Sequence, residues 1–228
     1  MLQPEGGFSA RIRSFIRRQG RLTQSQQQAL VRFSEKYCLD PHSPYQFQHV
    51  FGRQAPLIFE IGFGNGESLS QMAGENPEFD YLGVEVHRPG IGHLLNRLHE
   101  MKIDNVRVYC HDAVEVLEKN IPDGSLFAIH LFFPDPWPKT KHHKRRIIRP
   151  EFVSLVVRKL QRGGYFHAAT DWPHYAESML MELSKATDLK NASPDGGYCP
   201  KPHYRPITKF ERRGLALGHP IRDLIFFK

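Results

Sequence analysis

Short apolar runs alternate with helix-like stretches from residue 57 onward, and this alternation constrains the fold more than any other feature. We expect five strands because the runs are almost continuously apolar, which is typical of strands buried on both faces. They cover residues 57–61, 81–86, 106–110, 126–131 and 165–169. The stretches between them predict helices at 66–73, 89–101, 113–120 and 150–160. Repeated strand-then-helix order favours parallel pairing, so we expect an α/β fold with a mostly parallel sheet and helices on both faces.

The remaining segments are assigned less regular roles. Residues 174–187 predict a further helix, 224–227 a closing strand, and the Pro- and Gly-rich stretch 191–206 a surface loop. Near the N-terminus, Thr23 and Gln26 have the spacing of a capping box that opens a helix. We therefore expect a basic N-terminal arm and helix over residues 1–50, followed by a single domain over residues 51–228.

The positive charge of the chain is concentrated in two segments. The net charge is +7, and two acid-free runs hold much of it. The first run contains Arg11, Arg13, Arg17, Arg18 and Arg21, and the second contains Lys139, Lys141, Lys144, Arg145, Arg146 and Arg149. One such run alone is explained equally well by a solvated surface. Two runs on an otherwise slightly acidic chain indicate a polyanion as partner.

Cysteine and histidine usage indicates neither disulfides nor a metal site. The three cysteines, Cys38, Cys110 and Cys199, are far apart, which fits a reducing compartment. The 13 histidines show no HExxH or Cys/His ligand spacing, so we expect no metal. Neither a signal peptide nor a membrane-spanning apolar stretch is evident, so we expect a cytoplasmic protein without membrane contact.

A glycine-rich segment follows the first expected strand. It reads Glu60-Ile-Gly62-Phe-Gly64-Asn-Gly66 and leads into a helix, where glycines allow a ligand to approach the backbone. A tight turn without a ligand would explain the glycines alone. The spacing G-x-G-x-G differs from the dinucleotide pattern G-x-G-x-x-G, and a carboxylate before the first glycine would repel a pyrophosphate. The segment therefore disfavours a nicotinamide oxidoreductase and favours a ligand that carries a cation.

Carboxylates lie at the end of, or follow, each of the next four expected strands. They are Glu85, Asp112, Asp135 and Asp171. Any one of them alone is better explained as a helix cap or a turn residue. Ligands of open α/β sheets bind at the carboxyl ends of the strands, so together these acids indicate one site. S-adenosylmethionine fits them, because it carries a ribose, an adenine and a net positive charge.

The segment 133–146 joins a rigid acidic turn to the second basic run. Prolines flank Asp135 and hold it in place at little further entropic cost. Trp137 offers a face for stacking a base, and the cations that follow can hold phosphates. A structural turn with a core tryptophan explains the first part equally well. Thr208 and Glu211 have the spacing of a capped helix start.

Taken together, these motifs make the chain resemble the bacterial tRNA (guanine-N7)-methyltransferase family, which is class I and S-adenosylmethionine-dependent. The segments that carry the resemblance are 13–30, 59–66, 83–90, 110–117, 131–146, 169–172 and 208–214. The resemblance implies a Rossmann-like methyltransferase fold. It also implies methyl transfer to N7 of the guanosine at position 46, in the variable loop of tRNA.

The resemblance also implies roles for individual residues. The cofactor-binding set is Glu60, Gly62, Gly64, Gly66, Glu85, Asp112 and Asp135. The substrate-binding set is Lys139, Asp171, Thr208, Lys209, Phe210 and Glu211, and the RNA-binding set is Lys141, His142, His143, Lys144, Arg145 and Arg146. Asp135 is the first catalytic candidate and Asp171 the second. Lys141 stands where many members carry an arginine; lysine keeps the charge but lacks the bidentate fork.

Two other function classes stay open. One is a methyltransferase that acts on an exocyclic base nitrogen, since the Pro-Asp-Pro-Trp segment resembles the proline-rich acidic loop of such enzymes. The other is a non-catalytic RNA-binding module that kept the fold. tRNA is the expected partner, and no obligate protein partner is indicated.

Overall fold

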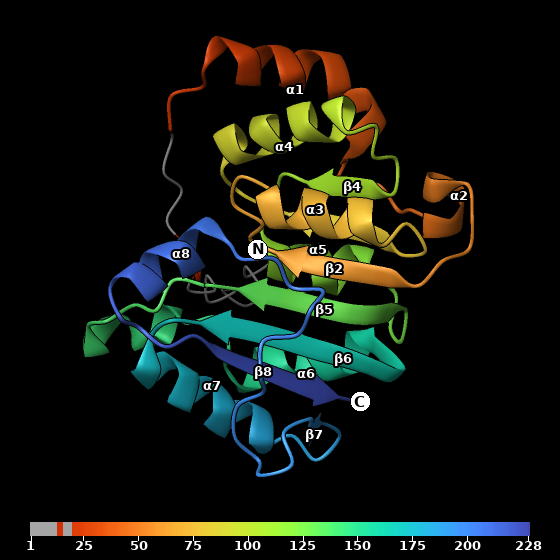
Figure 1. The fold of residues 1–228 in the computed structure, drawn as a ribbon. Helices are drawn as coiled ribbons and strands as arrows, with labels where there is room; N and C mark the ends of the chain where they lie inside the picture. The colour runs from red at the N-terminus through yellow and green to blue at the C-terminus, as the bar shows by residue number, and fades with distance from the viewer. Residues whose placement is uncertain (1–12, 16–19) are drawn as a thin grey trace, which may run out of the picture.

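The computed structural model describes residues 13–15 and 20–228, which are built around one sheet (Figure 1). The strands of this sheet are β1 (Cys38–Leu39), β2 (Leu57–Ile61), β3 (Asp80–Val84), β4 (Val106–Tyr109), β5 (Leu126–Phe132), β6 (Leu160–Thr170), β7 (Lys190–Asn191) and β8 (Arg222–Phe227). Their order across the sheet is β1-β4-β3-β2-β5-β6-β8-β7. The first six strands in this order pair in parallel, and β8 runs antiparallel to both β6 and β7. The expected mostly parallel sheet is confirmed.

Helices cover both faces of the sheet. They are α1 (Gln24–Tyr37), α2 (Phe47–Phe51), α3 (Glu67–Glu75), α4 (Arg88–Glu100), α5 (Ala113–Asn120), the 3-10 helix η1 (Thr140–Arg145), α6 (Pro150–Lys159), α7 (Pro173–Ser184) and α8 (Lys209–Ala216). Alternate residues of β2 point into two cores: Ile58 packs with apolar residues of α1, α3 and α4, and Phe59 with those of α5, α6 and α7. All five residues of β2 are buried, which explains its continuous apolar run. None of the described helices is long and apolar enough to cross a membrane.

The N-terminal helix is connected to the rest of the fold through α4 and through the short strand that follows the helix. The capping box is confirmed: the Thr23 N–H donates to Gln26 Oε1 over 2.9 Å, and the Gln26 N–H donates to Thr23 Oγ1 over 3.2 Å. Helix α1 lies against α4, and the short strand β1 pairs with β4 at the edge of the sheet (Figure 1). Strand β1 was not expected, because two residues carry no periodicity. The sheet contains β1, which lies before residue 50, and is therefore continuous across the expected division. The division at residue 50 stays an interpretation of the sequence.

The largest difference from the sequence expectation is the length of β6. We expected residues 165–169, but the strand begins at Leu160, directly after α6. The polar and glycine residues 161–164 interrupt the apolar pattern, and Gly163 has a left-handed φ of 75°. Pairing with β5 shifts register in this region, between Leu126 and Ala128. The rest of 191–206 forms the expected loop, apart from a single bridge between Cys199 and Asp223.

A close backbone contact joins the glycine-rich turn after β2 to the start of α4. A Cβ atom built on Gly90 would lie 2.0 Å from the carbonyl oxygen of Gly64. The atoms nearest to this Cβ, the carbonyl oxygen and carbon of Gly64, belong to the backbone. A side-chain rotation therefore cannot relieve the clash. Because Gly90 has no side chain, the start of α4 can lie against the Gly64 carbonyl.

We expect Gly90→Ala to lower the free energy of unfolding by at least about 2 kcal/mol, because α4 would have to move away from the turn. Gly74→Ala is the matched control, since its Cβ would lie 3.5 Å from the nearest atom, in ordinary contact. On an exposed helical position this control should stabilise by about 0.5–1 kcal/mol. Urea denaturation of both variants measures the difference, and equal effects would contradict the assigned contact.

Candidate active site

A cleft of about 530 Å³ opens at the carboxyl ends of β2, β3, β4 and β5. Strand β2 lies between β3 and β5, with β4 beyond β3 and β6 beyond β5, so the strand order reverses at β2 and the cleft sits where such folds bind ligands. Six of the expected cofactor-binding residues line it: Glu60, Gly62, Gly64, Glu85, Asp112 and Asp135. Gly66 does not line the cleft. It caps α3 with a φ of 77°, and a Cβ there would lie 2.6 Å from Leu94 Cδ1.

The turn after β2 is fastened to the end of β3 by the Glu85 carboxylate. The Gly64 N–H donates to Glu85 Oε2 over 2.9 Å. The N–H groups of Val86 and His87 donate to Oε1 over 2.7 and 3.0 Å. Gly62 and Gly64 have φ values of 69° and 62°, which side chains rarely adopt. Glu85 thus shapes the turn as well as lining the cleft.

Glu60 is a buried carboxyl that faces the cleft without a full set of partners. It is 3% exposed, and its Oε2 atom has no hydrogen-bond partner within the described part of the chain. Burial raises its pKa to about 8. A buried carboxyl of this kind gains a partner when a cationic group enters the cleft, so Glu60 fits a positively charged ligand.

Asp112 combines the two roles that the sequence left open. Its Oδ1 accepts the Val114 N–H over 2.9 Å and so caps α5. The residue is 4% exposed and also lines the cleft. A helix cap therefore explains its conformation, while its position still allows contact with a ligand.

The turn that carries Asp135 is bracketed by two strained residues. Phe133 and Trp137 have φ values of 52° and 47°, although neither is glycine. Hydrogen bonds hold both ends: the Phe133 N–H donates to the Ala169 carbonyl over 2.7 Å, and the Trp137 indole N–H donates to the Ser14 carbonyl over 3.1 Å. Asp135 itself is exposed at the cleft. Such conformations persist only where surrounding contacts enforce them, and they are common at functional sites.

Trp137 corrects one of the two descriptions that the sequence allowed. It is only partly buried, so it is not a core tryptophan. The guanidinium of Arg145 lies 5.0 Å from its ring centroid and so covers one face of the indole. A base that stacked on this face would have to displace Arg145.

The basic segment after this turn is not uniformly exposed. Lys139, Lys141 and Lys144 are exposed, while His142, His143 and Arg145 are partly buried. Arg146 is 6% exposed. Of the first basic run, Arg11, Arg17 and Arg18 lie outside the described residues.

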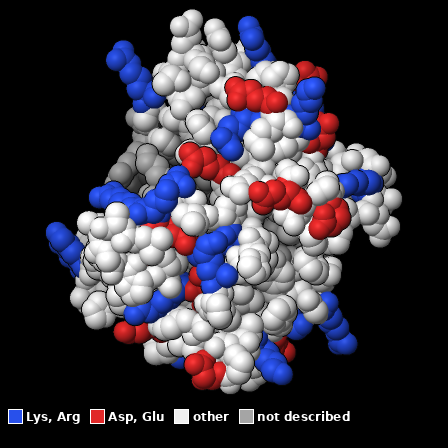
Figure 2. All heavy atoms as spheres, viewed as in Figure 1, with Lys and Arg blue, Asp and Glu red and all other residues white. Residues whose placement is uncertain are grey.

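Of Asp171, Thr208 and Glu211, only Thr208 lines the cleft. Asp171 follows β6, and its Oδ2 lies 3.8 Å from His219 Nδ1; it does not line the cleft. Thr208 lines the cleft and caps α8 by accepting the Glu211 N–H over 3.0 Å, as its spacing predicted. The side chains of Lys209 and Phe210 lie outside the described part. On the face drawn in Figure 2, basic side chains gather over α8.

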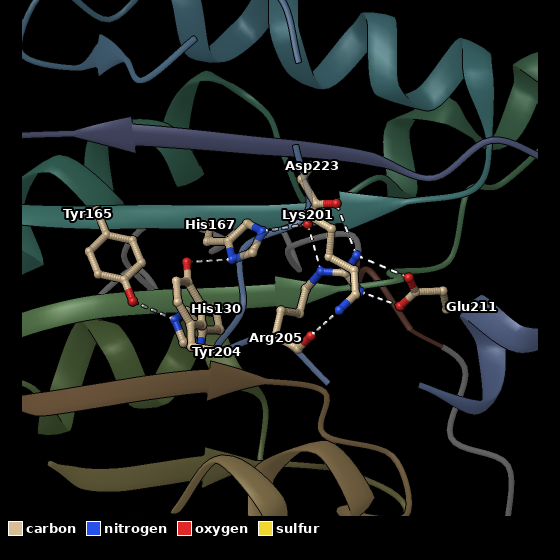
Figure 3. A network of polar contacts seen from close by, with 8 residues as sticks. All are labelled: His130, Tyr165, His167, Lys201, Tyr204, Arg205, Glu211 and Asp223. Carbon is tan, nitrogen blue, oxygen red and sulfur yellow. Dashed lines mark hydrogen bonds and ion pairs between the residues drawn. The ribbon is translucent and has the colours of Figure 1, made fainter. Parts of the chain in front are cut away.

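The Glu211 carboxylate is held by a buried network that the sequence did not indicate (Figure 3). Arg205 is fully buried and donates to Glu211 over 2.5 and 3.3 Å, and to both oxygens of Asp223 over 2.6 and 3.0 Å. His167 Nε2 lies 2.7 Å from Asp223 Oδ1. Burial alone would raise the pKa of Asp223, but the hydrogen bonds from His167 and Arg205 lower it. The network anchors α8 to the antiparallel strand β8.

Comparison with known proteins assigns this chain to a family. A family model described as a putative methyltransferase matches residues 54–224. The tRNA (guanine-N(7)-)-methyltransferase of Cronobacter sakazakii is 54% identical over 217 residues, which cover 95% of this chain and 91% of that protein. The chain belongs to the tRNA (guanine-N(7)-)-methyltransferase family.

Further relatives agree with this assignment. The enzyme of the same name from Shewanella amazonensis is 53% identical, over 97% of this chain and 94% of its own. Among solved structures, the 16S rRNA methyltransferase KamB superposes with a TM-score of 0.55 at 13% identity, over 82% of this chain and 95% of its own. An rRNA methylase from Streptococcus thermophilus reaches 0.52 at 14% identity, over 83% and 99%. These structures confirm the Rossmann-like methyltransferase fold.

The raised pKa of Glu60 predicts a pH dependence of stability. Its folded pKa of about 8 exceeds the ordinary value of 4.5, so its stabilising contribution is present below pH 4.5 and is lost as the pH rises toward 8. The free energy of unfolding of the wild type, relative to Glu60→Gln, should therefore fall by roughly 1 kcal/mol per pH unit between about pH 5 and pH 8. Urea titrations of both proteins across this range provide the measurement. Parallel pH profiles would show that Glu60 ionises normally.

Proposed function

We propose that this chain transfers a methyl group from S-adenosylmethionine to N7 of guanosine 46 in the variable loop of tRNA. The observation that carries the proposal is the placement of Asp135 at the cleft, with exposed lysines beginning four residues later. A cleft for a cationic methyl donor and a surface for a polyanion are thus joined by one short turn. The proposal includes a cytoplasmic location and action without an obligate protein partner.

The cleft fits S-adenosylmethionine. Glu60 offers an unpartnered buried oxygen to a cation, and Glu85 and Asp112 offer carboxylates at the ends of β3 and β4. Gly62 and Gly64 leave the backbone of the turn accessible, since a Cβ at either would meet no atom within 4 Å. When bound, S-adenosylmethionine supplies an electrophilic methyl group on a sulfonium.

The residues of the chain have mainly to position the base. Guanine N7 carries a lone pair and no proton, so its attack on the methyl group needs no general base. Proximity and orientation then contribute most, up to roughly 7–11 kcal/mol. In this proposal, Asp135 accepts hydrogen bonds from the guanine N1–H and N2–H edge and stabilises the positive charge that develops on the ring. Asp171 stays the second candidate for this role.

The other substrate contacts are part of the same proposal. Thr208 lines the cleft, and Lys139 is exposed four residues after Asp135. Both are proposed to contact the guanosine, together with Lys209, Phe210 and Glu211. Glu211 would do so while bound to Arg205, so its free hydrogen-bonding capacity is reduced. Lys141 and Lys144 are exposed and are proposed to contact the RNA backbone.

The function is tested by incubating the protein with labelled S-adenosylmethionine and bulk tRNA and identifying the methylated nucleoside. The proposal requires N7-methylguanosine, which makes the strand cleavable by aniline after reduction. Label in an exocyclic N-methylated base would instead support the alternative amino-methyltransferase. Binding of tRNA without binding of S-adenosylmethionine would support a non-catalytic module.

Asp135→Asn should lower kcat at least about 100-fold, because a neutral amide cannot stabilise the developing charge and presents a donor to the guanine edge. The exposed position of Asp135 predicts an unchanged fold. Single-turnover methylation, with circular dichroism and cofactor titration as controls, measures this. Turnover within threefold of wild type in a folded variant would remove Asp135 from the chemical step.

Replacing both Lys141 and Lys144 with alanine should weaken tRNA binding and reduce its salt dependence. Each lost phosphate contact lowers the log–log salt slope by about 0.7–0.9, so the double variant should be shallower by about 1.5. Lys190→Ala is the control, because Lys190 is exposed on β7 at the far edge of the sheet. Equal slopes for the double variant and the control would assign these lysines to solubility alone.

A further inference from the structure

Arg146 ends the basic segment but is placed unlike the other cations in it. Among Lys139, Lys141, Lys144, Arg145, Arg146 and Arg149, it is the one buried side chain, at 6% exposure. A phosphate group contacts cations that protrude into solvent. A buried guanidinium must instead find its partners within the protein.

Those partners are the turn that carries Asp135 and a helix on the same face as α6. Arg146 Nε donates to the carbonyl oxygen of Pro136 over 3.0 Å. Its guanidinium lies 4.7 Å from the ring centroid of Tyr175 in α7. Its Nη2 lies 3.2 Å from His143 Nε2. Since a guanidinium only donates, His143 accepts through Nε2 in this contact.

The carbonyl oxygen that Arg146 binds lies within the strained turn 133–137. Pro136 follows Asp135 directly and precedes Trp137, which has a φ of 47°. At the other end of the turn, Phe133 has a φ of 52° and is held by the Ala169 carbonyl. Trp137 is held through its indole N–H by Ser14. Arg146 thus binds the carbonyl oxygen of the residue that directly follows Asp135.

We propose that Arg146 is a positioning residue that fixes the turn carrying Asp135 and does not bind RNA phosphates. The expected effect of Arg146 on kcat rests on the proposed function, whereas its expected effect on the conformation of the turn does not. It separates Arg146 from the RNA-binding set that the family resemblance implied. His143, whose Nε2 contacts the guanidinium, leaves that set with it.

The test compares Arg146→Ala and Arg146→Lys with Lys144→Ala. Lysine keeps the charge but lacks both the Nε–H donor and the planar group that stacks on Tyr175. Three quantities are measured on the full chain: kcat and KM with tRNA, the salt slope of tRNA binding, and acrylamide quenching of Trp137 fluorescence. The quenching uses a Trp172→Phe background, since the chain has two tryptophans and Trp137 then reports on the turn alone.

We expect both Arg146 variants to lose at least tenfold in kcat, with KM for tRNA and the salt slope close to wild type. Quenching of Trp137 should increase in both. Lys144→Ala should instead lower the salt slope by about 0.7–0.9 and leave the quenching unchanged. Because the quenching needs no methyl transfer, it tests the inference even if the proposed reaction fails.

Two results would overturn the inference. One is a salt slope in Arg146→Ala that falls as much as in Lys144→Ala, with kcat and quenching unchanged, as a phosphate contact requires. The other is a folded Arg146→Lys protein with wild-type kcat and quenching, because the charge alone would then be sufficient. If Arg146→Ala does not fold, the lysine variant decides between the two roles.

Discussion

Parallel pairing of β2 with β3 on one side and β5 on the other is the constraint from which the site follows. These strands end at one edge, and the chain leaves β2 and β5 toward opposite faces of the sheet, so a cleft forms at their ends. Helices cover both faces of the sheet, and the cleft opens at this edge. Residues distant in sequence, such as Glu60 and Asp135, line the same cleft because each directly follows or ends a parallel strand.

Around this cleft, two of the acidic side chains that line it also accept hydrogen bonds from backbone N–H groups. Glu85 accepts three backbone N–H groups, and Asp112 caps α5. Glu60 is the contrast, because burial leaves one of its oxygens without a described partner. The turn at Asp135 and the start of α8 are each fastened by a buried arginine, Arg146 and Arg205 respectively. Buried cations therefore shape this site, while exposed lysines form its outer surface.

Sequence patterns predicted the longer strands, six of the seven expected cofactor-binding residues at the cleft and the family, because these depend on local periodicity and on a known topology. The 57–61 strand and the Thr23 and Thr208 caps were correct in detail. The burial of Arg146 was not predictable, because its neighbours Lys144 and Arg145 look the same in sequence. Arg205 was missed for a similar reason: its partners Glu211 and Asp223 come from a helix and a strand that meet only in the fold. Tertiary pairing of charges has no periodic signature.

We infer that the turn at Asp135 brings a tRNA guanine to the cleft at the ends of β2 and β5. A crystal structure of the protein with S-adenosylhomocysteine and tRNA would show where the guanine lies. We expect the guanine edge against Asp135 with N7 facing the sulfur, phosphates near Lys141 and Lys144, and Arg146 still bound to the Pro136 carbonyl. A guanine seated away from Asp135, or an Arg146 that has swung out to a phosphate, would contradict it.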